Sequence, residues 1–312
     1  MENSFETRMN EFARQALDAA QRAGISPAEV TVSSSESFSV RVRAQRLEDY
    51  KVSDRFHLVL RGAWQGRIGT ASTQAMDEES LQLLVQGVKE SAELIETDEQ
   101  DEILPPESAY EKVCNYSEDV QRISPEEKIA LAMAIDARLG ASDARVKPDA
   151  SLVASTSESF ALQNTLGLNL AHRSNMIYAY ASCLAKEEGQ AATGFKLLWG
   201  YALEDVDAIA VADGCAKDAL EKLGAGRLAS GARSVVIRSS AMADLLSTFA
   251  GVFSADNAQK GMSLLAGKEG QRIASDALTL VDDPLMPWGL GSCPFDREGA
   301  AARTKNVIFF IV

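Results

Sequence analysis

The sequence predicts an α+β fold, with antiparallel sheets covered by helices in two N-terminal domains and the start of a β-rich C-terminal domain. Apolar and polar residues alternate through residues 30–68 and again through 150–201, as in strands with one buried face. Segments with apolar residues at helical spacing flank both stretches. With 312 residues and 46% hydrophobic content, the chain can bury more than one compact core. The expected organisation is a first domain at 1–98, an acidic linker at 99–123, a central domain at 124–231 and an incomplete C-terminal domain at 232–312.

The first domain is expected to contain a helix, a meander of short strands and a second helix. The first helix should end near Gly24, because apolar residues recur at helical spacing at Phe5, Met9, Phe12, Ala16 and Ala20. Alternation then predicts a turn at residues 62–66 and short strands around residues 30–32, 38–42, 56–60 and 64–68. Asp77 can cap the second helix, whose apolar face ends at Ile95.

A linker and a helix with strong end signals come next. The stretch ETDEQDEILPPESAYEK holds seven acids, two prolines and no apolar periodicity, which is typical of a linker. Ser124 can cap the following helix, with Pro125 at its first position and Glu127 completing a capping box. Gly140 is expected to end this helix.

The central domain continues with a sheet and a covering helix. Its alternating stretch is interrupted by the turn sequences NTLG and KEEGQ, which predicts antiparallel hairpins. The segment DVDAIAVADGCAKDALEKLGAG then predicts a helix that stops at Gly224.

The last section predicts a strand at SVVIR, residues 234–238, and then a helix. One stripe of that helix is expected to face a core, and it consists of Met242, Leu245, Leu246, Phe249 and Phe253. At the end of the chain, NVIFFIV is expected to form an apolar strand that nothing pairs or covers.

Composition restricts the function classes. The chain has 45 acidic and 31 basic residues and a formal charge of −14, the wrong sign for direct binding to a nucleic-acid backbone. No signal peptide precedes the first helix, and no apolar run reaches the roughly 18 residues of a membrane span, so a cytoplasmic protein is expected. Cys114, Cys183, Cys215 and Cys293 form no CxxC pair, which favours reduced, buried thiols over disulfides or a zinc site.

The chemistry-bearing motifs are weak one by one. His57 and His172 match no metal-ligand spacing, and a satisfied structural histidine is favoured for both. A Ser-His-Asp triad stays open, because triads assemble in space, but no GxSxG elbow supports one. GMSLLAGKEG lacks the spacing and the hydroxyl of a phosphate loop, and GAGR and WGLGS lack a dinucleotide fingerprint.

Carboxylates gather near the end of the chain. Asp282 and Asp283 precede Pro284, and Asp296 lies two residues before Glu298. Such carboxylates can act in acid/base catalysis if their environments separate their pKa values. Aspartates before a proline more often bind turn backbone, so the structural interpretation is favoured.

An ordered set of motifs carries a family resemblance. ESFSVRVRAQRLEDYKVSD, GRIGTAST, NTLGLNL, QKGMSLLAGKEGQRIAS, LTLVDDP and GLGSCPFDREG follow one another along nearly the whole chain. Together they resemble the TldD/PmbA family, whose members are described as candidate modulators of DNA gyrase and as zinc-dependent peptidases that work as pairs of related subunits. The resemblance implies that GLGSCPFDREG and LTLVDDP form a structural family turn through Asp282, Asp283, Gly289, Gly291, Phe295, Asp296, Glu298 and Gly299.

The zinc motif of the family is missing here. Aligned without gaps, the HExxxH histidines fall on Leu246 and Gly251, and its glutamate falls on Ser247. Leucine and glycine offer zinc no side-chain donor, and serine is a poor general base. The chain therefore resembles the metal-free PmbA type, also called TldE. No catalytic residue, metal ligand or cofactor is expected in this chain, and zinc is expected only in a partner subunit.

The resemblance implies a PmbA/TldE-like subunit of a zinc peptidase system for peptide maturation or degradation, not catalytic alone. Its expected partners are a related HExxxH-bearing subunit or a second copy, and a peptide substrate. Because relatives continue further, a C-terminal truncation is also expected. The alternatives are a protein-binding modulator of DNA gyrase or of a toxin-antitoxin system, a metal-independent hydrolase using the carboxylates named above, and a relative without function. Whether the chain takes part in catalysis is left open.

Overall fold

The computed structural model describes residues 2–96 and 102–308, which divide into two compact units. The first unit comprises the chain up to residue 225 together with 285–302, and the second comprises 226–284 and the residues from 303 onward. Helices and antiparallel strands occur in the same units, so the predicted α+β class is confirmed. Among the described residues, no helix has both the length and the apolar character needed to cross a membrane.

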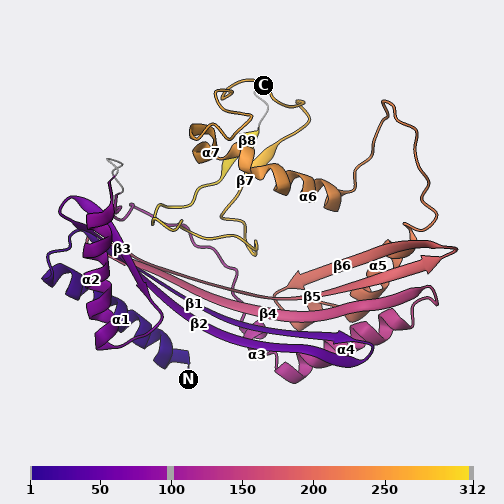
Figure 1. Cartoon of the computed structure of the whole chain (residues 1–312), viewed down its shortest axis with the longest axis horizontal. Coiled ribbons are helices and arrows are strands. Elements are labelled where there is room, and N and C mark those ends of the chain that lie inside the picture. The colour runs from indigo at the N-terminus through magenta and orange to yellow at the C-terminus, as the bar shows by residue number, and fades with distance from the viewer. Residues whose placement is uncertain (1, 97–101, 309–312) are drawn as a thin grey trace. The chain divides into compact units, whose positions relative to one another are not determined.

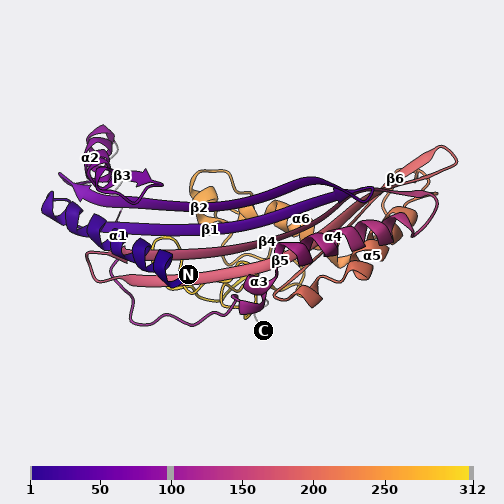
Figure 2. The ribbon, with the colours of Figure 1, turned by 90° about the horizontal axis from the view of Figure 1, so that it is seen from below.

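One antiparallel sheet organises the first unit (Figure 1). Its six strands follow the order β3-β2-β1-β4-β5-β6. The strands are β1 (Ala28–Arg43), β2 (Arg46–Trp64), β3 (Arg67–Thr73), β4 (Val146–Asn164), β5 (Asn169–Glu187) and β6 (Gln190–Gly200). Pairing of β1 with β4 makes the sheet continuous through the expected domains 1–98 and 124–231. The long strands run side by side and curve together, as Figures 1 and 2 show.

The predicted short strands at residues 30–32 and 38–42 are wrong in extent, because they belong to the single strand β1. The polar run between them keeps its pairing on both sides, for example at Ser35, which lies opposite Arg55 on β2 and Glu158 on β4. Backbone hydrogen bonds on both edges hold this stretch extended without an apolar side chain. The turn from β2 to β3 lies at Gln65 and Gly66, both at positive φ.

Helices cover one face of the sheet at its two ends (Figures 1 and 2). Helices α1 (Glu2–Arg22) and α2 (Glu78–Leu94) pack on Val30 and Val32 of β1. Helices α4 (Pro125–Gly140) and α5 (Ala208–Leu220) belong to the core around Val40 and Val42. Even-numbered β1 residues thus face the helices, and odd-numbered ones point to the opposite side, called the open face below.

Local end signals in the sequence are confirmed. Asp77 caps α2 by accepting from the Ser80 amide, and Ser124 and Glu127 form the predicted capping box of α4. Residues 97–101, which include the start of the expected linker, lie outside the described residues. Residues 102–117 form neither helix nor strand, and helix α3 (Glu118–Arg122) follows; a short 3-10 helix, η1 (Leu203–Asp205), precedes α5.

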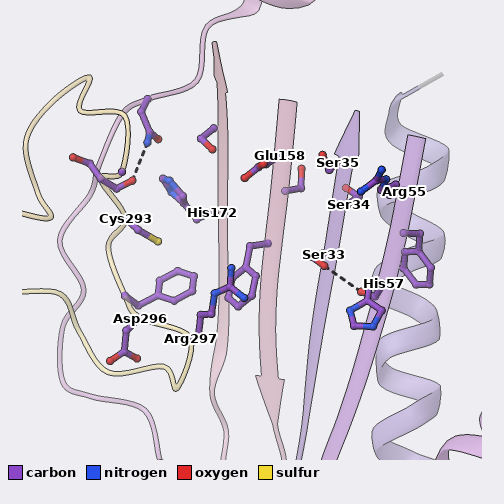
Figure 3. Close-up of a pocket in the computed structure, with 18 of the residues that line it drawn as sticks. Ser33, Ser34, Ser35, Arg55, His57, Glu158, His172, Cys293, Asp296 and Arg297 are labelled. Carbon is purple, nitrogen blue, oxygen red and sulfur yellow. Dashed lines mark hydrogen bonds between the residues drawn. The ribbon is translucent and has the colours of Figure 1, made fainter. Parts of the chain in front are cut away.

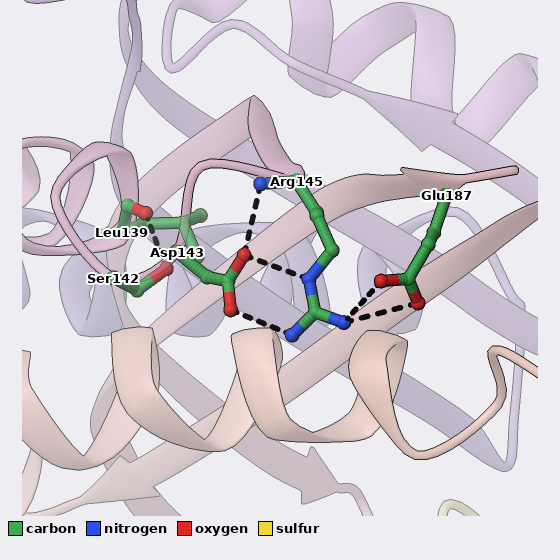
Figure 4. A network of polar contacts seen from close by, with 5 residues as sticks. All are labelled: Leu139, Ser142, Asp143, Arg145 and Glu187. Atoms are coloured by element: carbon green, nitrogen blue, oxygen red, sulfur yellow. Dashed lines mark hydrogen bonds and ion pairs between the residues drawn. The ribbon is translucent and has the colours of Figure 1, made fainter.

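A polar network joins the loop after α4 to the last residue of β5 (Figure 4). The Arg145 guanidinium donates to both carboxylate oxygens of Asp143, at 2.9 and 2.8 Å, and to Glu187 at 3.0 Å. Ser142 donates its hydroxyl to the Leu139 carbonyl at 2.7 Å. The hydrogen bonds from Arg145 hold the pKa of Asp143 at about 2, well below its ordinary value.

Asp143→Asn is expected to flatten the acid dependence of stability. The pKa of Asp143 is lower in the folded protein than in the unfolded chain, so its charged form stabilises the fold above a pH of about 4, and this contribution disappears as pH falls to about 2. The difference in thermal midpoint between wild type and variant should shrink across that window. Arg145→Gln should flatten it in the same way, and an unchanged difference at both ends would contradict the assignment.

The second unit contains short elements. They are α6 (Ser239–Phe249), the 3-10 helix η2 (Ala250–Phe253), α7 (Ala255–Gln259) and the antiparallel pair β7 (Leu280–Asp282) and β8 (Lys305–Ile308). The predicted strand at 234–238 is wrong: these residues pair with no described strand, and Val236 is fully exposed. An unpaired end strand is also wrong for residues 306–308, which lie in β8; residues 309–312 lie outside the described part.

The helix predicted after residue 238 is confirmed as α6, but its apolar stripe does not face a core. Leu245, Leu246 and Phe249 are all exposed, Phe249 by 56%. Helical periodicity identifies an apolar face, yet burial also requires a second element packed against that face, and the unit's other described elements do not cover these side chains.

Candidate functional site

A pocket of about 630 Å³ lies on the open face of the sheet in the first unit (Figure 3). Strands β1, β2, β4 and β5 form its floor, and residues 290–297 form a wall. Its size falls in the usual range of ligand sites.

The floor consists of two rows of side chains that strand register sets next to one another. Residues paired directly across antiparallel strands point to the same face, so each row follows from the pairing. One row reads His57, Ser33, Phe160 and His172 across β2, β1, β4 and β5. The other row, two residues along each strand, reads Arg55, Ser35, Glu158 and Ser174. Cationic, hydroxyl, acidic and aromatic groups therefore share one surface.

The wall is held on the sheet by the segment before α3. Asn115 donates from Nδ2 to the Ser292 carbonyl at 2.8 Å, and the Trp288 amide donates to the Cys114 carbonyl at 2.9 Å. The Tyr110 hydroxyl donates to the Gly299 carbonyl at 2.9 Å. These bonds fix the end of a turn-rich segment that has no helix or strand of its own.

His172 and Asn115 keep unused acceptors at the wall. His172 makes a hydrogen bond with the backbone of Ser292, while burial lowers its pKa. Its Nε2 atom and the Oδ1 atom of Asn115 are buried and have no partner in the described part of the chain. The hydrogen bond to Ser292 therefore uses Nδ1 as the donor and ties His172 to the wall, as expected of a structural histidine. His57 is exposed on the open face.

One charged group of the pocket binds the chain's own backbone, whereas two others face the pocket. The Asp296 carboxylate accepts from the amides of Glu298 and Ala300, at 2.9 and 3.0 Å, and so stabilises a turn. Arg297 points from the wall across the strands, and Glu158 is exposed on the floor (Figure 3). Burial raises the pKa of the Cys293 thiol, which disfavours a thiolate nucleophile. The pocket can thus hydrogen-bond and pair charges with a ligand, but its thiol is not activated.

The family-turn residues divide between the two units. Asp282 pairs with Lys305 at 3.2 Å and Asp283 accepts from the Thr304 hydroxyl at 2.7 Å, both in the second unit. The other residues of the turn lie in the first unit, and three of them line the pocket: Gly291, Phe295 and Asp296.

Phe295 and Gly299 explain the packing of this turn. Phe295 is buried against Tyr110 and Phe160, with ring centroids 6.4 and 6.0 Å away. Gly299 has φ +85°, and a Cβ there would collide with the Leu168 side chain. Sequence reasoning named these residues only as a structural turn and missed the floor, whose rows join residues from four separate strands.

The residues at the zinc-motif positions do not fit a zinc ion. Leu246 and Ser247 lie on α6 and Gly251 lies in η2, so neither histidine position carries a donor side chain. Within residues 2–96 and 102–308, no three His, Cys, Asp or Glu side chains come close enough to hold a metal. Of the cysteines, Cys183 and Cys215 are buried as predicted, whereas Cys114 is exposed.

Comparisons with known proteins agree with this architecture. The chain is similar to metalloprotease PmbA of Escherichia coli O157:H7, with 23% identity over 90% of this chain and 63% of that protein. Its fold is similar to a Thermotoga maritima structure named "putative modulator of a DNA gyrase" (TM-score 0.88, 23% identity, 96% of this chain, 68% of that one). It is also similar to TldE of Thermococcus kodakarensis (TM-score 0.81, 18% identity, 96% of this chain, 67% of that one).

The chain spans less than two thirds of the length of the curated PmbA relative. Three family models match along the chain: PmbA/TldA metallopeptidase domain 1 at residues 28–92, the central domain at 118–226 and the C-terminal domain at 230–309. Because these models together cover most of the sequence in the family's order, the chain belongs to the PmbA/TldD family.

Proposed function

We propose that this chain is a PmbA/TldE-like cytoplasmic subunit of a zinc peptidase system that matures or degrades peptides, and that it is not catalytic alone. The observation that carries the proposal is the side chains at the zinc-motif positions, Leu246, Ser247 and Gly251. Zinc peptidases need nitrogen, sulfur or oxygen ligands and a general base that activates water. These three residues supply neither.

Zinc and the activated water therefore come from a related HExxxH-bearing subunit, because a second copy of this chain, the other expected partner, carries the same three residues and adds no zinc ligand. This chain contributes binding surface. The pocket suits that role, because its hydroxyls, Glu158 and Arg297 can bind peptide amides and charged ends. Its Cys293 thiol is not activated, which agrees with binding more than with bond cleavage.

Native mass spectrometry with metal analysis tests the proposal. The isolated chain should carry no stoichiometric zinc, and mixing with an HExxxH-bearing relative from the same source should give a defined complex. Peptidase activity should appear only in the mixture, and should vanish when the relative's motif histidines are replaced by alanine. Stoichiometric zinc or zinc-dependent peptidase activity in the isolated chain would overturn the proposal.

A modulator that contacts DNA gyrase is the second candidate, supported by the names of solved relatives and by the net charge of −14. We rank it second because an acidic surface also serves solubility, a simpler explanation for the same charge.

A further inference from the structure

Strand β6 is an edge of the six-stranded sheet, and one half of it is protected. The Phe195 amide donates to Asp218 at 3.1 Å, and the Thr193 carbonyl accepts from Lys222 at 2.9 Å. These two backbone groups bind side chains of α5 and its C-terminal turn instead of β5. The odd-numbered residues of β6 therefore direct their backbone groups away from the sheet.

The other half of the edge has no such protection. The Phe195 carbonyl, both backbone groups of Leu197 and the Trp199 amide also point outward, and in the described part of the chain they have no hydrogen-bond partner. Natural edge strands usually block such groups with charges, prolines or bulges. On β6 the charged pair Asp218–Lys222 blocks one end, and residues 195–199 stay available.

Side chains of the same residues form an exposed apolar surface. Phe195, Leu197 and Trp199 lie on the open face and are 53, 39 and 40% exposed. Phe195 contacts Tyr180, with ring centroids 5.4 Å apart, and Trp199 contacts Tyr201 at 6.0 Å. Tyr201 in turn contacts Trp288 at 4.7 Å, and these six residues are called the aromatic platform. Rigid aromatic side chains of this kind are enriched where binding energy concentrates.

We propose that residues 195–199 of β6 bind an extended peptide by strand addition, with alternate apolar side chains of the peptide lying on the aromatic platform. An extended backbone is the ligand that can pair alternating N–H and C=O groups along an edge while placing every second side chain on one face. A compact apolar ligand would cover the platform and leave the edge groups unpaired. A second copy of the chain is disfavoured, since each copy carries a net charge of −14.

This inference rests on the proposed function for its substrate class, a peptide, and adds a second place on this chain, besides the pocket, that can hold part of such a peptide. The site differs from the pocket described above, because none of the platform residues lines that pocket.

The test measures fluorescence anisotropy of a labelled, end-blocked peptide of alternating valine and threonine with the full chain, without zinc or partner. Two further peptides carry N-methyl groups, one on the valine amides and one on the threonine amides. Strand addition uses only one set of amides, so one methylated peptide should lose binding and the other should keep it. Equal binding of the two would overturn the proposal.

Variants of β6 locate the binding edge. Leu197→Pro removes an outward N–H and should weaken binding by roughly tenfold relative to Leu197→Ala, which keeps that group. Thr193→Pro is the matched control, since it changes the same side of the same strand outside the proposed segment, and it should bind like wild type. Thermal unfolding checks that all variants fold.

Undiminished binding by Leu197→Pro would overturn the proposal. So would a dimer of the chain that forms through this edge and is lost in the same variant, because the occupant would then be a second copy. With neither zinc nor partner subunit in the assay, failure here leaves the subunit proposal standing, and failure of complex formation leaves strand addition standing.

Discussion

Gly194→Ala is expected to destabilise the first unit by about 3 kcal/mol, because it forces a methyl group into a closed contact between β6 and α5. A Cβ at this position would collide with the Cys215 carbonyl oxygen and lie 2.8 Å from the Ala219 amide nitrogen. Both are backbone atoms of a helix whose inner side chains are fully buried, so the helix cannot retreat without opening the core. Urea unfolding followed by circular dichroism would measure the loss.

Gly140→Ala is the matched control. It lies at the end of α4, where a Cβ would meet only the Pro148 ring at 3.7 Å, an ordinary contact. Alanine favours helix over glycine, so this variant should stay within about 0.5 kcal/mol of wild type or gain slightly. If both variants lose the same stability, the close approach of β6 to α5 is not the cause.

Gly194 also marks a limit of sequence reasoning. In the sequence it is one glycine in an alternating stretch, and only the docked helix shows why a side chain is excluded. The signals that did predict structure are local ones. The capping box of Ser124 and Glu127 and the cap at Asp77 need contacts only three residues away.

Long-range pairing could not be predicted in the same way. Ser35 and its polar neighbours were predicted as a break between strands, because their partners Arg55 and Glu158 lie on strands far away along the chain. The same limit applies to the pocket floor. His57 and His172 share one row only through the register of the two strands between them, a relation that no spacing in the sequence encodes.

The family motif marks the turn that forms the wall, whereas no motif marks the floor. GLGSCPFDREG contains the residues that shape its own turn. The Asp296 carboxylate stabilises the turn, and Gly299 adopts the positive φ that the turn requires. In α6, by contrast, the sequence shows the apolar stripe, but no described element of its unit covers that stripe. Periodicity reports which face is apolar, and burial depends on what lies opposite.

Arg61→Ala is expected to cost about 3 kcal/mol, because it removes the guanidinium that pairs with the buried carboxylate of Glu29. Arg61 Nη1 lies 3.1 Å from Glu29 Oε1 across the β1–β2 pair, and the Glu29 side chain is only 2% exposed. Water cannot replace the guanidinium at such a site as it would at the surface. Arg61 itself is 19% exposed, which places the expected cost at the lower end of the range for buried pairs, about 3–5 kcal/mol.

Two comparisons separate this effect from a general loss of an arginine. Arg138 binds Asp213 at 2.8 Å with both side chains about half exposed, so Arg138→Ala should lose no more than about 1 kcal/mol. The double variant Glu29→Leu with Arg61→Leu should recover much of the stability lost in Arg61→Ala, since it removes the buried carboxylate together with the guanidinium. Urea unfolding of the four proteins supplies the free energies. Equal losses for Arg61→Ala and Arg138→Ala would contradict the prediction, because the Arg61 guanidinium would then stabilise the buried carboxylate no more than an exposed ion pair stabilises the surface.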